Sequence, residues 1–465
     1  MQKRKLVIFA VGPALSAALG LITLPLTAWI FEPDDIGRLN LLQTLIAVSM
    51  NLAFMGLDNA FVREFHEEDD RTSLYSTTMT PPLLLLGVLT LPVVLFPASF
   101  STLVYGLDSA VFGYATVATL FLSLLIRQWA LVARMNEWAI TFTFSQVIPK
   151  LVTLAGLGTV ALVATRPGFL VLALVLLLSL GVAGFYMNLA TLRLRPLTSS
   201  FRIVWGRLVS LLKYGLPAMI AAFSFVAMSA IGPFSLRVYS DFHELGIYSV
   251  AVSIAAAVGV VQYSFNTVWG PAIFKANAAG RVLDVYPSAL RAVCAIFAIV
   301  ASGVALLSWV LPLLLPKEYA QIEFLLVGAA LVPLLLMMRD AGGIGNNIAR
   351  RMGQVAGASV VALLVCLLLS LALVPRFEAK GAVLASLFAM WALFVINAET
   401  AARSWISVSR ATMHLVVGLA VMLATVTVWW GERLGRWHLL GWVVYAVAVV
   451  FYFRRDLRAM LVRGK

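Results

Sequence analysis

Arg127 and Arg134 are the residues whose type and spacing most directly suggest chemistry. Arg127 follows a long apolar run, and Arg134 comes seven residues later, in the stretch SLLIRQWALVARMNEW (123–138). A spacing of seven places two side chains on one face of a helix. A charge at the centre of a bilayer costs roughly 2.5–3.5 kcal/mol, so such an arginine normally faces a cavity, a partner or a substrate. The surrounding elements decide which of these applies.

The composition indicates a membrane protein with many helices. Hydrophobic residues make up 62% of the chain and charged residues 12%, which differs strongly from soluble domains. A helix needs about 20 apolar residues to cross the hydrocarbon. Such runs lie near 6–30, 38–58, 74–96, 111–133, 139–163, 169–192, 212–236, 245–270, 288–315, 321–341, 353–374, 381–402, 412–430 and 438–453. We therefore predict an all-α polytopic membrane protein with about 14 transmembrane helices.

The basic residues predict the orientation of these helices. With the N-terminus in the cytoplasm, 24 of the 34 lysines and arginines fall on cytoplasmic segments and eight on the opposite side. Cytoplasmic loops carry an excess of basic residues, so we expect both termini in the cytoplasm. The two remaining basic residues, Arg127 and Lys150, lie inside predicted helices. Because the net charge of +13 resides in short loops, we expect no nucleic-acid partner.

The connections between the predicted helices are too short for a catalytic domain. The longest, near 193–211 and 271–287, have fewer than 20 residues, whereas a domain usually needs at least about 50. No GxxxxGK[ST] string occurs, and the two cysteines and four histidines show no metal-ligand spacing. We expect no enzyme activity, no cofactor and no metal site, and transport becomes the leading class of function.

A faint internal repeat predicts how the helices are grouped. Gly12 and Pro13 open a helix that runs to the acidic turn EPDDIG, and Gly215 and Pro217 open one that runs to DFHELG. Both copies start on the same side of the membrane, which is typical of transporters built from a parallel repeat. We expect two six-helix lobes and then a helix pair with a basic tail, at 1–200, 201–402 and 403–465.

Three stretches resemble one family of membrane transporters. GRLNLLQTLIAVSMNLAFMGLDNAFVREF (37–65) resembles the second helix of polysaccharide biosynthesis proteins, the Wzx-type flippases of the MOP exporter superfamily. The stretch 125–151 resembles their fourth-to-fifth helix junction, and 245–275 resembles their eighth helix. The likeness covers roughly residues 1–402. Many members have twelve helices, so the pair at 412–453 departs from the pattern, although the related lipid II flippases also have fourteen.

The resemblance implies a substrate and a location. The substrate would be a polyprenyl-pyrophosphate-linked oligosaccharide, flipped by alternating access across the bacterial inner membrane for O-antigen, capsule or exopolysaccharide assembly. Membrane lipids, a glycan polymerase and a chain-length regulator become candidate partners. Three alternatives stay open: a flippase for lipid II-type peptidoglycan precursors, a scaffold of a glycan polymerase complex that transports nothing, and an exporter of small cations.

The basic residues in and beside the membrane are predicted to bind the pyrophosphate. Arg127 lies ~10 Å from the inner end of its helix and Lys150 ~16 Å, at 1.5 Å per residue. Neither has an acid three or four residues away. A group of charge about −2 accepts charge-assisted hydrogen bonds from both side chains. The predicted substrate-binding residues are Arg127, Lys150, Arg134, Arg63, Lys275 and Arg291.

Some of these residues also have a plain structural explanation. Arg134 can reach the inner interface by extending along its helix. Arg63 has Glu67 at i+4, a spacing typical of an ordinary ion pair on a helix. Structural and binding roles therefore both stay open for Arg63 and Arg134.

The acids indicate which class of transporter is favoured. Glu399 has Arg403 at i+4 and Asp340 adjoins Arg339, so both acids are predicted to be paired near the inner surface. No carboxylate lies near the middle of a predicted helix, which disfavours a cation exporter. Asp58, at the end of the predicted second helix, and Asp340 are the candidates for ion coupling.

Overall fold

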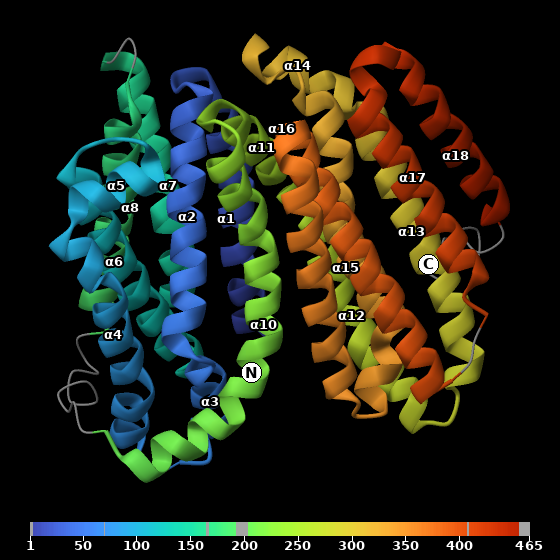
Figure 1. The fold of residues 1–465 in the computed structure, drawn as a ribbon. Helices are drawn as coiled ribbons and strands as arrows, with labels where there is room; N and C mark the ends of the chain where they lie inside the picture. The colour runs from blue at the N-terminus through green and yellow to red at the C-terminus, as the bar shows by residue number, and fades with distance from the viewer. Residues whose placement is uncertain (1–2, 69, 164–166, 192–202, 407–408, 455–465) are drawn as a thin grey trace. The chain divides into compact units, whose positions relative to one another are not determined.

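The computed structural model describes residues 3–68, 70–163, 167–191, 203–406 and 409–454, without the side chains of 3–10, 217, 218 and 221. These residues are mainly helical and contain no strand. The predicted fold class, an all-α polytopic membrane protein, is confirmed. The chain divides into two compact units, Met1–Ala230 and Ile231–Lys465 (Figure 1). The predicted lobe boundary at 200/201 and most of the basic tail lie outside the described residues, so the predicted three-part division stays a prediction.

The first unit is a bundle in which α6 contacts helices on several sides. It packs against α2, α4, α5, α7 and α8, and α1 packs along α7. Both arginines of the opening stretch therefore lie on a helix with many neighbours. The helices are α1 (Lys3–Ile30), α2 (Pro33–Phe54), α3 (Leu57–Glu64), α4 (Arg71–Leu95), α5 (Pro97–Tyr105), α6 (Ala110–Met135), α7 (Ala139–Val163), α8 (Phe169–Ala190) and the first part of α10 (Trp205–Tyr239).

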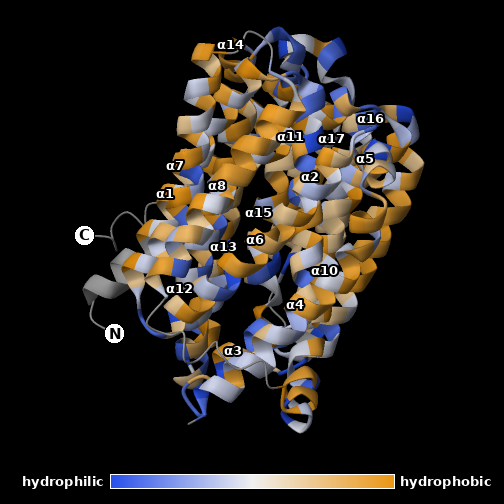
Figure 2. Ribbon diagram, turned by 90° about the vertical axis from the view of Figure 1, so that its left-hand side faces the viewer, coloured by the Kyte–Doolittle hydropathy of each residue, from blue (hydrophilic) through white to orange (hydrophobic). Residues whose placement is uncertain are grey.

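The outward faces of these helices are apolar. Val88, Leu103 and Phe185 are 67%, 74% and 67% exposed, as expected for side chains that face hydrocarbon rather than water. Several hydroxyls on buried faces bond within their own helix; Thr78 Oγ1, for example, donates to Leu74 O at 2.8 Å. Figure 2 shows the apolar colour along the lengths of the helices and the hydrophilic colour chiefly near their ends.

A sharp turn separates α2 from α3. Met55 and Gly56 adopt φ values of 47° and 77°, in the left-handed region, which ends α2 at Phe54. α3 then departs at an angle of 55°. The predicted single helix over 38–58 is therefore wrong, because two left-handed residues cannot continue a right-handed helix. As a result, Asp58 lies in the first turn of a separate short helix.

The second unit is built around α15, the most buried of its candidate spans. α15 contacts α11, α12, α13, α16 and α17, and α18 packs on α13 and α17. A 3₁₀ turn at Ala256–Val258 separates α11 from α12. The helices that follow α10 are α11 (Phe242–Ala255), α12 (Gly259–Ala278), α13 (Val282–Leu307), α14 (Leu311–Leu314), α15 (Ile322–Ile348), α16 (Met352–Ser404), α17 (Ala411–Leu434) and α18 (His438–Tyr452).

The long helices can be counted as membrane crossings in more than one way. In the described residues, 11 helical segments can cross a membrane, or 12 if α2 and α3 form one bent span. α16 has 53 residues with a non-helical break at Glu378, and the segment Ala411–Tyr452 holds both α17 and α18. If each of these two segments crosses twice and α2 with α3 forms one bent span, the number becomes the predicted 14, which stays a prediction. The nine-residue α5 was not predicted, because it is too short to span.

Candidate functional site

An arginine and an aspartate pair between α3 and α6. Arg127 Nη2 donates to Asp58 Oδ2 at 2.6 Å, and the guanidinium lies 4.8 Å from the centroid of the Phe54 ring. The Arg127 and Asp58 side chains are 39% and 19% exposed. No acid lies three or four residues from Arg127, and its counter-ion instead comes from 69 residues earlier in the chain. This partner lowers the cost of a charge within a membrane helix.

A cavity of about 240 Å³ lies beside the pair. As the seven-residue spacing predicts, Arg127 and Arg134 both line it. The volume is below the ~300–1,000 Å³ of typical small-molecule sites, so the cavity has room for a compact group but not for an oligosaccharide. The lining residues, from α3, α6 and the first turn of α7, are Asp58, Asn59, Val62, Arg127, Ala130, Leu131, Arg134 and Phe142.

Arg127 keeps hydrogen-bonding capacity for a ligand. A guanidinium carries five N–H donors, and within the described residues Arg127 makes one hydrogen bond. Both oxygens of Asp58 are engaged, because its Oδ1 accepts from the Asn59 backbone N–H at 2.9 Å. An anion that enters the cavity would therefore meet unused Arg127 donors and the exposed side chain of Arg134.

Packing fixes α6 on α4 next to the pair. Gln128 Nε2 donates to Met79 O at 2.8 Å, and the rings of Trp129 and Tyr75 stack with centroids 6.0 Å apart. Met79 belongs to a buried apolar cluster that also contains Phe61 of α3. The backbone on both sides of the Asp58–Arg127 contact is thus held by a packed core.

Arg63 lies at the end of α3, with its side chain 52% exposed. Its Nε is 3.8 Å from Glu64 Oε1, and its guanidinium lies 4.5 Å from the centroid of the Tyr214 ring. The predicted ion pair with Glu67 is wrong, because α3 ends at Glu64 and the helical i+4 neighbour no longer exists. Arg63 does not line the cavity.

Lys150 lies in α7, eight residues beyond the cavity-lining Phe142. Its side chain is exposed in this structure, and it has no ion-pair partner among the described residues. The structure does not bring it into the cavity beside Arg127. Its role in binding stays a prediction.

The predicted residues of the second unit lie on α12, α13 and α15. Lys275 is exposed in the last turn of α12, and Arg291 is exposed on α13. Asp340 is paired with Arg339 as predicted, with a Nε–Oδ1 distance of 2.9 Å. Its other oxygen accepts from Asn266 Nδ2 at 2.9 Å. Both oxygens of this candidate coupling residue are therefore occupied.

The predicted Glu399–Arg403 pair is wrong. Glu399 Oε1 lies 2.8 Å from Nε2 of His414, so the acid of α16 contacts α17 rather than a neighbour on its own helix. The sequence gives no local signal for this contact, because it joins two helices. It ties α17, the first helix of the predicted additional pair, to α16.

The described part of the chain shows no cluster of three or more His, Cys, Asp or Glu side chains that could hold a metal. Cys294 and Cys366 are buried thiols in the second unit and are not joined by a disulfide. The chemistry that the cavity itself offers is charge and hydrogen bonding.

Comparison with known proteins identifies the family. A sequence model described as polysaccharide biosynthesis protein matches residues 3–277. The chain belongs to this family. No curated protein sequence matches it.

The fold of this polysaccharide biosynthesis protein is that of MOP superfamily transporters. A solved structure of the lipid II flippase MurJ, in an inward closed conformation, matches with a TM-score of 0.68 and 13% identity, over 97% of this chain and 99% of that one. An inward-facing multidrug resistance MATE family transporter of the MOP superfamily matches with a TM-score of 0.59 and 15% identity, over 85% and 97%. At these identities the likeness concerns the fold alone.

The family match includes the candidate site. The three stretches whose resemblance predicted the family, 37–65, 125–151 and 245–275, all lie within 3–277, and the predicted membership is confirmed. The matched residues also contain every side chain that lines the cavity.

Proposed function

We propose that this protein flips a polyprenyl-pyrophosphate-linked oligosaccharide across the bacterial inner membrane by alternating access. The observation that carries the proposal is that Arg127, an arginine of a membrane helix, lines a small cavity together with Arg134. Membership of the polysaccharide biosynthesis family and the MOP transporter fold support it. The glycan would serve O-antigen, capsule or exopolysaccharide assembly.

Binding would exchange one anion for another at Arg127. In the structure Asp58 supplies one carboxylate oxygen to the guanidinium. A diphosphate has more acceptor oxygens and a charge of about −2, and charge-assisted bonds to such groups are strong and often bidentate. Arg134, on the same cavity wall, would add a second positive charge. When the substrate leaves, Asp58 would again neutralise Arg127, so release would not leave an unpaired charge.

We propose that the cavity lies near the cytoplasmic side. Basic residues favour the cytoplasmic side of a membrane. Four of them lie at the helix ends on this side of the unit: Arg63 in the last turn of α3, Arg71 at the start of α4, Arg134 in the last turn of α6 and Arg207 in the first turn of α10. The same bias supports both termini in the cytoplasm. The substrate would therefore enter the cavity from the leaflet in which lipid-linked sugars are assembled.

A lipid II-type precursor is the second candidate substrate. The fold likeness to the lipid II flippase MurJ over 97% of the chain favours it. Both substrates would present a diphosphate to Arg127, so the site alone does not separate them. A cation exporter is disfavoured, because two arginines and one aspartate line the cavity. A glycan polymerase and a chain-length regulator are partners only within this proposal.

Transport in vesicles tests the proposal. Purified protein is reconstituted, and the transfer of a fluorescent polyprenyl-diphosphate oligosaccharide, of lipid II and of a small organic cation is measured separately. We expect transfer of the oligosaccharide lipid, and a reduction of about tenfold or more in Arg127→Gln, since hydrogen bonds to charged groups contribute about 1.5–3 kcal/mol. A scaffold would transfer none of the three.

Arg38→Gln is the matched control. Arg38 forms another arginine–aspartate pair in the first unit, with a 2.9 Å contact to Asp35, but it does not line the cavity. Its loss should leave the transfer rate per folded molecule near the parent value. Equal transfer by the parent and by Arg127→Gln would contradict the proposal.

A further inference from the structure

The start of α10 is held against α3 and α4 of the first unit. Figure 1 shows the first turns of α10 running beneath α3 and α4 before the helix turns along the bundle. Beyond Ala230 the same helix continues into the second unit. The contacts that hold the first turns of α10 therefore connect the first unit to the helix that continues beyond it.

The backbone of α10 approaches the turn before α3 at two glycines, one on each side. A Cβ on Gly215 would lie 2.8 Å from Gly56 O, and one on Gly56 would lie 2.2 Å from Gly215 O. Gly56 also has a φ of 77°, which L side chains rarely adopt. The backbone of α10 thus sits directly on the turn that precedes α3, and Asp58 follows two residues later.

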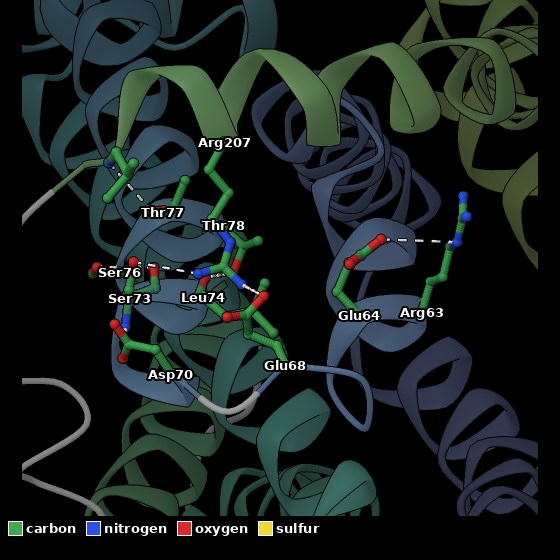
Figure 3. A network of polar contacts seen from close by, with 11 residues as sticks. Arg63, Glu64, Glu68, Asp70, Ser73, Leu74, Ser76, Thr77, Thr78 and Arg207 are labelled. Atoms are coloured by element: carbon green, nitrogen blue, oxygen red, sulfur yellow. Dashed lines mark hydrogen bonds and ion pairs between the residues drawn. The ribbon is translucent and has the colours of Figure 1, made fainter.

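An ion pair holds α10 eight residues before Gly215, near the start of the helix. Arg207 pairs with Glu68, on the connection between α3 and α4, and its Nη1 lies 3.4 Å from Ser73 Oγ. Figure 3 shows Arg207 reaching down from α10 between Glu68 and Ser73. The Arg207 and Glu68 side chains are only 18% and 34% exposed, so the pair is partly shielded from water. Val204 N–H adds a bond to Thr77 Oγ1 at 3.4 Å.

The far end of α3 is held as well. The guanidinium of Arg63 lies over the Tyr214 ring of α10. The eight-residue α3 is thus contacted by α10 at Gly56, just before its first residue, and at Arg63, in its last turn. Asp58, Asn59 and Val62, the α3 residues of the cavity wall, lie between these two contacts.

We infer that these contacts form a clasp that positions Asp58 opposite Arg127 and ties the site to α10. The clasp consists of Gly56, Arg63, Glu68 and Ser73 on one side and Arg207, Tyr214 and Gly215 of α10 on the other. This inference rests on the proposed function and deepens it. When the clasp is released, α3 can move. This movement changes the distance between Asp58 and Arg127 and the access to the cavity. The clasp residues are positioning residues that do not touch the substrate.

The test measures how accessible the cavity is to a thiol reagent and does not depend on transport. Asn59→Cys is made after both native cysteines, Cys294 and Cys366, are replaced by alanine, and its labelling by a membrane-impermeant maleimide is timed in membranes. Arg207→Gln and Glu68→Gln should each change the labelling rate by about threefold, as expected for the loss of one partly exposed ion pair. The double exchange Glu68→Arg with Arg207→Glu should return the rate toward the parent value.

The control is Lys380→Gln in the same background. Lys380 and Glu432 form a pair of 2.8 Å in the second unit, with side chains 24% and 44% exposed, and its loss should not change labelling at position 59. Parent-like labelling in both single variants, or no recovery in the double exchange, would overturn the clasp. If labelling follows the clasp but the parent transfers no diphosphate lipid, the proposed function fails and the clasp stands. If the parent transfers the diphosphate lipid but labelling does not follow the clasp, the clasp is refuted and the proposed function stands.

Discussion

Replacing Asp58 by asparagine should tighten substrate binding and slow turnover. In the proposed exchange, the Asp58 carboxylate competes with the diphosphate for the Arg127 guanidinium. Asparagine keeps the shape of the side chain but removes the charge, so a competitor is lost. The apparent KM for the lipid diphosphate should therefore fall, and kcat should fall with it, because release no longer returns Arg127 to a charged partner.

The size of the effect follows from the contact. One hydrogen bond of 2.6 Å joins the two charged groups, and such bonds contribute about 1.5–3 kcal/mol. Arg127 is 39% exposed and Asp58 19%, so water weakens the contact and we take the lower end of this energy range. It corresponds to a change of about tenfold in a binding constant. KM should fall by about that factor.

Initial rates of lipid transfer in vesicles over a range of substrate densities give KM and kcat separately. A double-mutant cycle with Arg127→Gln isolates the coupling between the two side chains, and thermal unfolding in detergent reports loss of stability. If Asp58→Asn raises KM as much as Arg127→Gln does, Asp58 assists binding rather than competing with the substrate, and the exchange mechanism is refuted.

Three further outcomes are expected. Arg134→Gln should raise KM by only a few-fold, because the side chain is exposed and its charge is screened by water; a loss as large as that of Arg127→Gln in the transfer assay would contradict this. Glu399→Gln should lower stability by about 0.5–1 kcal/mol through its partly exposed contact with His414, without changing KM; a normal melting temperature with impaired transfer would contradict it. An inside-negative diffusion potential should accelerate outward transfer, because each charge gains ~2.3 kcal/mol per 100 mV; transfer that follows only a proton or sodium gradient would instead point to Asp58 or Asp340.

Much of the helical fold could be predicted from the sequence, because long apolar runs leave few alternatives to membrane helices. Features that depend on single backbone angles could not. The break after Phe54 comes from left-handed angles at Met55 and Gly56, and a glycine inside an apolar run does not by itself predict a turn. The short α5 begins at Pro97 and ends before the left-handed Gly106, and hydropathy over a membrane length overlooks such a piece.

The site was predicted in part. The spacing of Arg127 and Arg134 placed both on one face, since it depends only on helix geometry. The partner of Arg127 could not be found this way, because Asp58 approaches from another helix. Local pairing rules failed for the same reason at Glu399, where His414 of α17 is the observed contact.

The most direct test of the central claim is the affinity of the protein for a lipid diphosphate in nanodiscs. Binding of a labelled polyprenyl-diphosphate oligosaccharide is measured for the parent, for Arg127→Gln and for the Arg38→Gln control, with inorganic diphosphate as competitor. We expect Arg127→Gln to weaken binding by about tenfold or more, as for the loss of charged hydrogen bonds, while Arg38→Gln binds like the parent and free diphosphate competes. Equal affinity in the parent and Arg127→Gln, with no competition, would contradict the assignment of Arg127 as the diphosphate ligand.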